Sequence, residues 1–148
     1  MFKTLRSLLI GFSLAVLAAV SAVPVQAATA NYPLGTQVSI IPFHISGQYT
    51  ASTTAVVRFT LPYKAKLIGV SSTARASGGT SPTLTVDVKS GGTTVLSTPT
   101  AITAGTVAES VITVSTLADE ASITVDLAIT GTSPTWNDIT ILLTVVRL

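Results

Sequence analysis

The side chains of this chain that could carry acid–base chemistry or bind a metal are one histidine and six carboxylates. His44 lies between Phe43 and Ile45, and a two-residue period turns it away from the face that these neighbours share. No carboxylate lies near it in the sequence, and the chain has no cysteine. A catalytic histidine would need partners supplied by the fold, so we interpret His44 as a strand residue that faces solvent or an interface.

The carboxylates fall into two patterns. Asp87 and Asp126 occupy equivalent positions in two Thr-Val-Asp segments, and both are expected on the polar face of a strand. Asp119 and Glu120 lie between strands, and with Asp138 they are the candidates for a calcium site. The spacing of a calcium-binding loop is missing, so we predict no metal and no cofactor. A hydrolase would need two carboxylates, or the histidine and a serine, to meet in a cleft. No serine lies in a G-x-S-x-G segment, so we predict no catalytic residue and no enzyme.

Aromatic residues offer a different chemistry, the stacking of a ligand on a flat ring. Trp136 follows the second of two Gly-Thr-Ser-Pro-Thr segments, and Tyr49 and Tyr63 lie in loops or at strand ends. Loop aromatics on a β-sandwich are suited to stack sugars. We therefore take Trp136, Tyr63 and Tyr49 as the candidates for ligand binding. The alternative, which we prefer for Trp136, is that its indole closes the end of the core.

The first 27 residues have the layout of a secretory signal peptide. Lys3 and Arg6 form a basic start, residues 8–20 form an apolar run, and Val25-Gln26-Ala27 supplies the small residues of a cleavage site. The apolar run is short for a membrane span, which needs roughly twenty residues. We predict that residues 1–27 are removed from an exported protein that is extracellular, periplasmic or on a cell or virion surface. An uncleaved hydrophobic N-terminal segment is the alternative.

Residues 28–148, which we predict to form one domain, carry no net charge. Without Lys3 and Arg6, six basic and six acidic residues remain. So few charges provide no basic patch for phosphates, which excludes nucleic acid as a partner. They also provide little of the like-charge repulsion that keeps many proteins apart. We expect a homo-oligomer or an array of copies on a particle or cell surface. A glycan is a further candidate partner, and membrane contact is expected only through the N-terminal segment before cleavage.

After residue 30, apolar residues recur at every second position. In the segment from Leu84 to Lys89 the even positions are apolar, and in the segment from Ile123 to Leu127 the odd positions are. This period is typical of strands with one face on a core and one in water. Strands separated by Gly- and Pro-containing turns are predicted at 36–46, 54–61, 64–76, 83–89, 92–98, 107–115, 121–130 and 136–147.

Short strands at regular spacing predict an all-β fold, an antiparallel two-sheet β-sandwich that is jelly-roll-like, with a Greek-key variant as the alternative. Beside Pro42, the apolar parity switches from Val38 and Ile40 to the segment that begins at Ile41, which suggests a bulge or an edge strand. Residues 139–146 are apolar on both parities. This pattern indicates a strand that is central in its sheet or covered by a neighbouring subunit.

The segment Gly-Thr-Ser-Pro-Thr occurs twice, at residues 79–83 and 131–135. The similarity does not continue in one register beyond these five residues. Both copies contain the residues of a turn, since glycine permits the bend and proline fixes φ. We interpret the repeat as one turn used twice rather than as a duplicated domain, so two binding sites do not follow.

Between Phe59 and Arg147 the chain carries, in order, the segments FTLP, AKLIGV, SPT, VDV, GGTTVLS, ITVDL and LTVVR. This succession resembles small β-sandwich proteins of bacteriophage virions, of the head-decoration and fibre-associated type, over roughly ninety of the 148 residues. The resemblance implies a non-enzymatic protein that assembles into or onto a particle. The signal-peptide-like start departs from it, because a virion protein made in the cytoplasm does not need one.

We therefore predict a non-catalytic structural or assembly protein, displayed on a virion or an extracellular surface, that self-associates through sheet faces or edges. The alternative is a secreted carbohydrate-binding or adhesion module that uses its loop aromatics.

Overall fold

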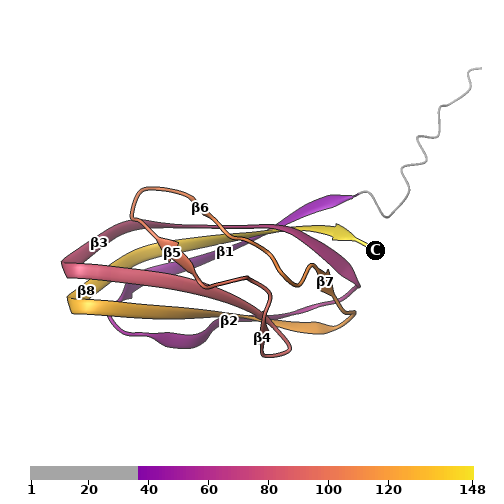
Figure 1. Cartoon of the computed structure of the whole chain (residues 1–148), viewed down its shortest axis with the longest axis horizontal. Helices are drawn as coiled ribbons and strands as arrows, with labels where there is room; N and C mark the ends of the chain where they lie inside the picture. Colours follow the sequence, from indigo (N-terminus) through magenta and orange to yellow (C-terminus); the bar gives the residue numbers. More distant parts are fainter. Residues whose placement is uncertain (1–36) are drawn as a thin grey trace, which may run out of the picture. The chain divides into compact units, whose positions relative to one another are not determined.

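Two long strands, β3 (Ala65–Ser90) and β8 (Ala121–Arg147), organise the fold of the computed structural model, which describes residues 37–148. They pair antiparallel along their whole length, from Ala65 opposite Arg147 to Ser90 opposite Ile123. Midway along, the pair folds back on itself, so that each strand runs through both layers of a sandwich (Figure 1). The predictions for the signal peptide and for the start of the domain at residue 28 lie outside the described residues.

The other strands extend these two layers. β1 (Val38–Tyr49) pairs with the half of β8 after the bend, and β2 (Thr53–Leu61) pairs with the half before it. The first half of β3 pairs with β6 (Ala108–Glu109) and β7 (Thr116–Leu117). Its second half pairs with β4 (Thr93–Thr94) and β5 (Thr100–Ile102). We call the layer that contains β1, β6 and β7 the first sheet, and the layer that contains β2, β4 and β5 the second sheet.

Within residues 37–148 all elements are strands and all their pairings are antiparallel, which confirms the predicted all-β, jelly-roll-like sandwich. The strands predicted at 92–98 and 107–115 are reduced to short pieces. The reason is that this part of the chain crosses the side of the sandwich from one half of β3 to the other and finds a partner strand only locally. None of the described residues belongs to a helix that could cross a membrane.

The two Gly-Thr-Ser-Pro-Thr segments lie opposite each other at the bend of the β3–β8 pair. Thr80 pairs with Thr132, and the ladder is irregular on both sides of this pair before regular pairing resumes. One bend is therefore used twice, as interpreted from the sequence, but the expectation of separate strands on either side of it is wrong, because both copies lie inside continuous strands. A short-range turn and a bend within a strand contain the same residue types, and only the pairing distinguishes them.

Both copies of the repeat also adopt the same backbone conformation. The φ angles of Gly79 and Gly131 are 97° and 126°, and those of Ser81 and Ser133 are 48° and 50°. A Cβ added to Gly79 would lie 2.4 Å from the carbonyl oxygen of Ser133, and one added to Gly131 would lie 2.8 Å from that of Ser81. Each of the two positions therefore requires glycine for two reasons, the positive φ and the close approach of the two backbones.

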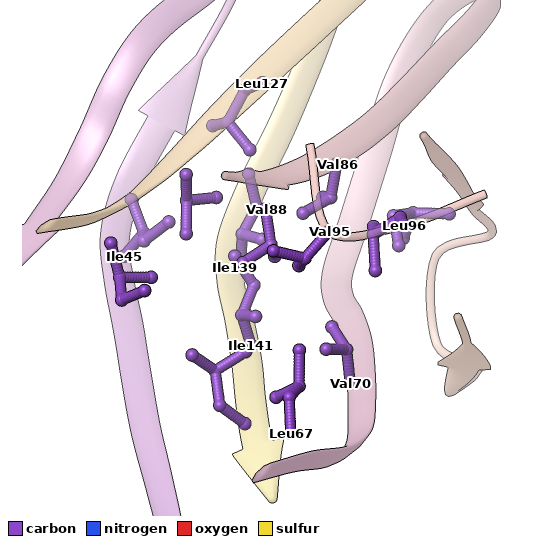
Figure 2. Packing of buried hydrophobic residues seen from close by; sticks show 14 of the residues in the cluster. Ile45, Leu67, Val70, Val86, Val88, Val95, Leu96, Leu127, Ile139 and Ile141 are labelled. Atoms are coloured by element: carbon purple, nitrogen blue, oxygen red, sulfur yellow. The ribbon is translucent and has the colours of Figure 1, made fainter. Parts of the chain in front are cut away.

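The core lies between the sheets and consists of alternate residues of the long strands. In β8 the odd-numbered residues from Ile123 to Ile129 and from Ile139 to Val145 are buried, so the predicted two-residue period holds on both sides of the bend. Figure 2 shows side chains from β1, β3 and β8 meeting with Val95 and Leu96, which follow β4. Fully burying one such side chain stabilises the fold by roughly 1.5–3 kcal/mol.

β1 is an edge strand, since among the described residues it pairs only with β8. Its register with β8 runs without a break through Pro42, and the irregularity lies between Ile45 and Gln48. The prediction of an edge is therefore confirmed, and the alternative of a bulge at Pro42 is wrong. The parity switch has another cause, because Val38 and Ile40 face outward and are 59% and 62% exposed.

Candidate functional site

Asp87 and Asp126 face each other on the outer side of the second sheet, where they form a direct pair in the β3–β8 ladder. The Nζ of Lys89 lies 2.6 Å from Oδ2 of Asp126 and 3.8 Å from Oδ2 of Asp87. The amide of Ala55 donates to Oδ1 of Asp126 at 2.7 Å, and the hydroxyl of Thr94 donates to Oδ1 of Asp87 at 2.5 Å. Both carboxylates are therefore held by a shared cation and by one further hydrogen bond each.

This arrangement favours the charged forms of Asp126 and Lys89. The hydrogen bond from Lys89, followed by that from the Ala55 amide, holds the pKa of Asp126 below its ordinary value of 3.8. The same contact raises the pKa of Lys89 above its ordinary value of 10.5. A general acid would need a raised carboxyl pKa, which is the opposite shift. Hollows of about 260 and 480 Å³ adjoin Asp126, but its oxygens are already bonded, so we assign the cluster a structural role.

His44 lies exposed on the outer side of the first sheet, as its place in the two-residue period predicted. Its Nδ1 is 3.0 Å from Oγ1 of Thr140. Nearby, Asp138 accepts a hydrogen bond from the amide of Gly47 at 3.0 Å and pairs with Nε of Arg75 at 2.6 Å. These two contacts hold the pKa of Asp138 below its ordinary value. Within residues 37–148 no serine is hydrogen-bonded to the imidazole, and the hydroxyl that it contacts is that of Thr140.

The three candidate calcium ligands do not come together. Asp119 and Glu120 are exposed just before β8, and Asp138 lies in β8 beyond the bend. Asp119 and Glu120 precede the half of β8 that lies in the second sheet, whereas Asp138 lies in the half that belongs to the first sheet. Residues 37–148 contain no group of three or more acidic or histidine side chains that could hold a metal ion.

The predicted ligand-binding aromatics are engaged inside the fold. Trp136 is only 2% exposed and pairs with Tyr49 in the β1–β8 register. A buried indole cannot stack on a ligand, so that interpretation of Trp136 is wrong and its alternative place in the core is the observed one. The misleading signal was the preceding Gly-Thr-Ser-Pro-Thr, which we took as a loop. Tyr49 packs against the core, and the guanidinium of Arg147 lies 5.0 Å from the ring centroid of Tyr63. A ligand-binding role for the two tyrosines stays a prediction.

Apolar side chains gather on the outer side of the first sheet. Four of them are 46–66% exposed, and two on β8 lie half-buried between the outer strands. The exposed valine beside β6 and a leucine of β8 line one small hollow of about 40 Å³. We define the apolar face as Val38, Ile40, Ile68, Val107, Leu142 and Val146.

The register places these side chains on one side of the sheet. On β8 the odd-numbered residues point into the core, so the even-numbered Leu142 and Val146 point outward. Val38 pairs directly with Val146 and shares its side. Ile68 stands at a bulge between Leu67 and Gly69, and it is exposed while Leu67 is buried.

The sequence pattern indicated part of the apolar face. Residues 139–146 are apolar on both parities because their strand is central, between β1 and β3, and also bears outward-facing apolar residues. Ile68 and Val107 could not be assigned to the same face from the sequence. Their placement depends on the bulge in β3 and on the local pairing of β6.

These features define the class of the molecule, an antiparallel β-sandwich of jelly-roll type with one apolar outer face. No family model matches the chain, and no curated protein matches it. Among solved structures it is similar to a chain of the "Cyanophage Pam1 capsid asymmetric unit", with a TM-score of 0.52 and 17% identity. The match covers 88% of this chain and 99% of that chain.

Two structures of infectious bursal disease virus, one of the Gx strain and one of virus-derived T=1 particles, are also similar. Each is 15% identical, with TM-scores of 0.42 and 0.44, and the match covers 75% of this chain. It covers only 32% of each viral chain, so this chain corresponds to about a third of their length. At these identities the likeness is one of fold, and the resemblance to virion proteins rests on that fold.

Proposed function

We propose that the chain is a non-catalytic structural protein that assembles with other protein subunits on a virion or an extracellular surface. The observation that carries this proposal is the apolar face. Contiguous exposed apolar surface on a folded domain marks a contact site. The outer side of the second sheet provides the contrast, because it bears the ion-paired Asp87, Lys89 and Asp126 instead.

The fold likeness supports the virion setting. The cyanophage capsid chain shares the architecture over nearly its whole length, so a domain of this size and topology is compatible with a place in a capsid. A catalytic role has less support from the chemistry on the surface. The oxygens of Asp126 are bonded to Lys89 and Ala55, and His44 contacts a threonine hydroxyl.

Export of the chain is part of the same proposal where the surface is extracellular. The basic start, apolar run and small residues of positions 1–27 support it. The intact mass of the protein isolated from its producing cells tests this point. A mass that corresponds to a chain beginning at Ala28 supports export with cleavage, and a mass that includes Met1 contradicts it.

Fractionation of particles from a producing culture tests the structural role itself. We expect the chain to co-sediment with particles in a density gradient, in a fixed ratio to the main capsid protein, and to stay bound through a salt wash. Such a wash removes proteins held only by surface charge. A chain that is found only in the soluble fraction would contradict the proposal.

A further inference from the structure

The apolar face consists of regular rows of side chains across the first sheet. One row contains Val38, Val146 and Lys66, which pair in register. Two residues further along β1, the next row contains Ile40 and Thr144, and Thr144 pairs with Gly69 beside Ile68. The central row is therefore lined by two exposed isoleucines with a threonine and a glycine between them.

The third row completes the pattern. It contains Pro42, Leu142 and Ser71, and Ser71 pairs with Glu109 on β6. The first and third rows are thus alike, since each has an apolar residue on β1 and on β8. Each also contains a charged residue. In the first row this is Lys66 on β3, beyond which lies Thr116 of β7, and in the third row it is Glu109 on β6.

Lys66 and Glu109 are both exposed, and the ion pairs of residues 37–148 involve neither of them. They carry opposite charges and lie one row away from the central row on either side, Lys66 on β3 and Glu109 on the neighbouring β6. A two-fold axis that crosses the strands at this row would lay the first row of one copy on the third row of another. Val146 would then meet Leu142 of the second copy, and Lys66 would approach Glu109 of the second copy.

A second copy fits this surface better than a partner of different chemistry. The charges in the three rows are one positive and one negative, so the rows are their own electrostatic complement and do not select a strongly charged partner. The rows span roughly four strands and five residues, or on the order of 300 Å² in projection. A standard interface buries roughly 800 Å² per partner, so a contact of this size falls in the range of weak complexes whose formation depends on concentration.

We propose that two copies of this chain pack first sheet against first sheet around a two-fold axis at the Ile40–Thr144 row, with reciprocal Lys66–Glu109 pairs. This inference rests on the proposed assembly function and specifies the contact that it uses. Each strand of one copy then lies over the same strand of the second copy and runs antiparallel to it. The strands of the two sheets are therefore aligned, which is one of the arrangements that packed β-sheets adopt.

Sedimentation velocity of the full chain over a range of concentrations tests this dimer. Ile40→Lys places two like charges beside the axis and should make the protein monomeric. The residue is 62% exposed, so the fold should be unchanged, and an unaltered circular dichroism spectrum and melting temperature would show this. Wild-type protein that remains monomeric throughout, or a dimer that tolerates Ile40→Lys, overturns the proposal. In those cases the face is covered by residues before Gln37, by another protein, or by solvent.

Charge reversal tests the two-fold geometry separately. Lys66→Glu and Glu109→Lys should each raise the dimer dissociation constant at least about tenfold, because each creates two like-charge pairs. The double variant should restore most of the affinity. Arg58→Glu changes the net charge equally on the exposed outer side of the second sheet and should have little effect. Failure of the double variant to recover overturns the pairing.

Particle binding distinguishes this inference from the proposed function. If Ile40→Lys is monomeric and no longer enters particles, both hold. If the wild-type chain enters particles but never dimerises, the dimer is wrong and the structural role stands. If the wild-type chain dimerises but is absent from particles, the virion role is wrong and the dimer stands.

Discussion

Replacing Gly79 by alanine tests whether the approach of two backbones at the bend is a requirement of the fold. At a φ of 97° an alanine is strained in itself. Its Cβ would also lie 2.4 Å from the carbonyl oxygen of Ser133 and 2.8 Å from that of Thr132. These are main-chain atoms of the paired strand, so they cannot move aside by a side-chain rotation. The overlap between the added Cβ and these atoms can be removed only by a shift of β8 at the bend, where the two sheets meet.

The expected magnitude follows from these two effects. The positive φ costs about 1–2 kcal/mol, and forcing packed atoms apart adds roughly 1–3 kcal/mol. We therefore expect Gly79→Ala to lower the free energy of unfolding by about 2–5 kcal/mol. Gly47→Ala is the matched control. Its φ is 98° and its added Cβ would have no atom within 4 Å, so only the conformational cost of about 1–2 kcal/mol applies.

Equilibrium urea unfolding, followed by the fluorescence of the single tryptophan, measures both variants against the wild type. Gly131→Ala should resemble Gly79→Ala, because its Cβ would lie 2.8 Å from the carbonyl oxygen of Ser81. If Gly79→Ala and Gly47→Ala lowered the free energy of unfolding equally, the close contact at Gly79 would have no effect on stability and the prediction would be wrong. The bend would then need glycine only for its conformation, and the contact between the two repeats would contribute nothing.

Four further variants test other parts of the structure. The pKa of Asp126 is lowered in the folded state, so its charge stabilises the fold above the ordinary value of 3.8, and this contribution disappears as pH falls through the folded pKa. Between neutral pH and strong acid, the urea midpoint of the wild type should therefore fall more than that of Asp126→Asn. Parallel pH profiles of the two proteins would contradict this. Trp136→Ala removes the only tryptophan and should lower the free energy of unfolding by about 3–5 kcal/mol in urea unfolding followed by circular dichroism, and native wild-type fluorescence that is not blue-shifted from the unfolded spectrum would contradict burial of the indole. Arg75→Ala should lower the free energy of unfolding by less than about 1 kcal/mol, because the Arg75 side chain is 72% exposed. Asp138→Ala also loses the hydrogen bond from the Gly47 amide and should lower it more. The reverse order of the two variants in urea unfolding would contradict these contacts.

The candidate site shows where sequence patterns are informative. Asp87 and Asp126 were expected on polar strand faces from their period, and they lie there. Their direct opposition and the bridging Lys89 are properties of the β3–β8 register, which a single sequence does not contain. Likewise, the period placed His44 on the outside, but its contact with Thr140 depends on which strand lies beside β1.

The sequence by itself determined the alternation of inward and outward residues, and with it the all-β class, because a strand exposes its side chains to opposite sides in turn whatever its neighbours are. The tertiary structure decided which strands meet, that the repeated Gly-Thr-Ser-Pro-Thr segments bend together, and that Trp136 is buried while Ile68 is not. These outcomes depend on long-range pairing between β3 and β8, whose paired residues are as many as 82 positions apart, as for Ala65 and Arg147. Local residue preferences act over only a few positions and cannot specify such pairs.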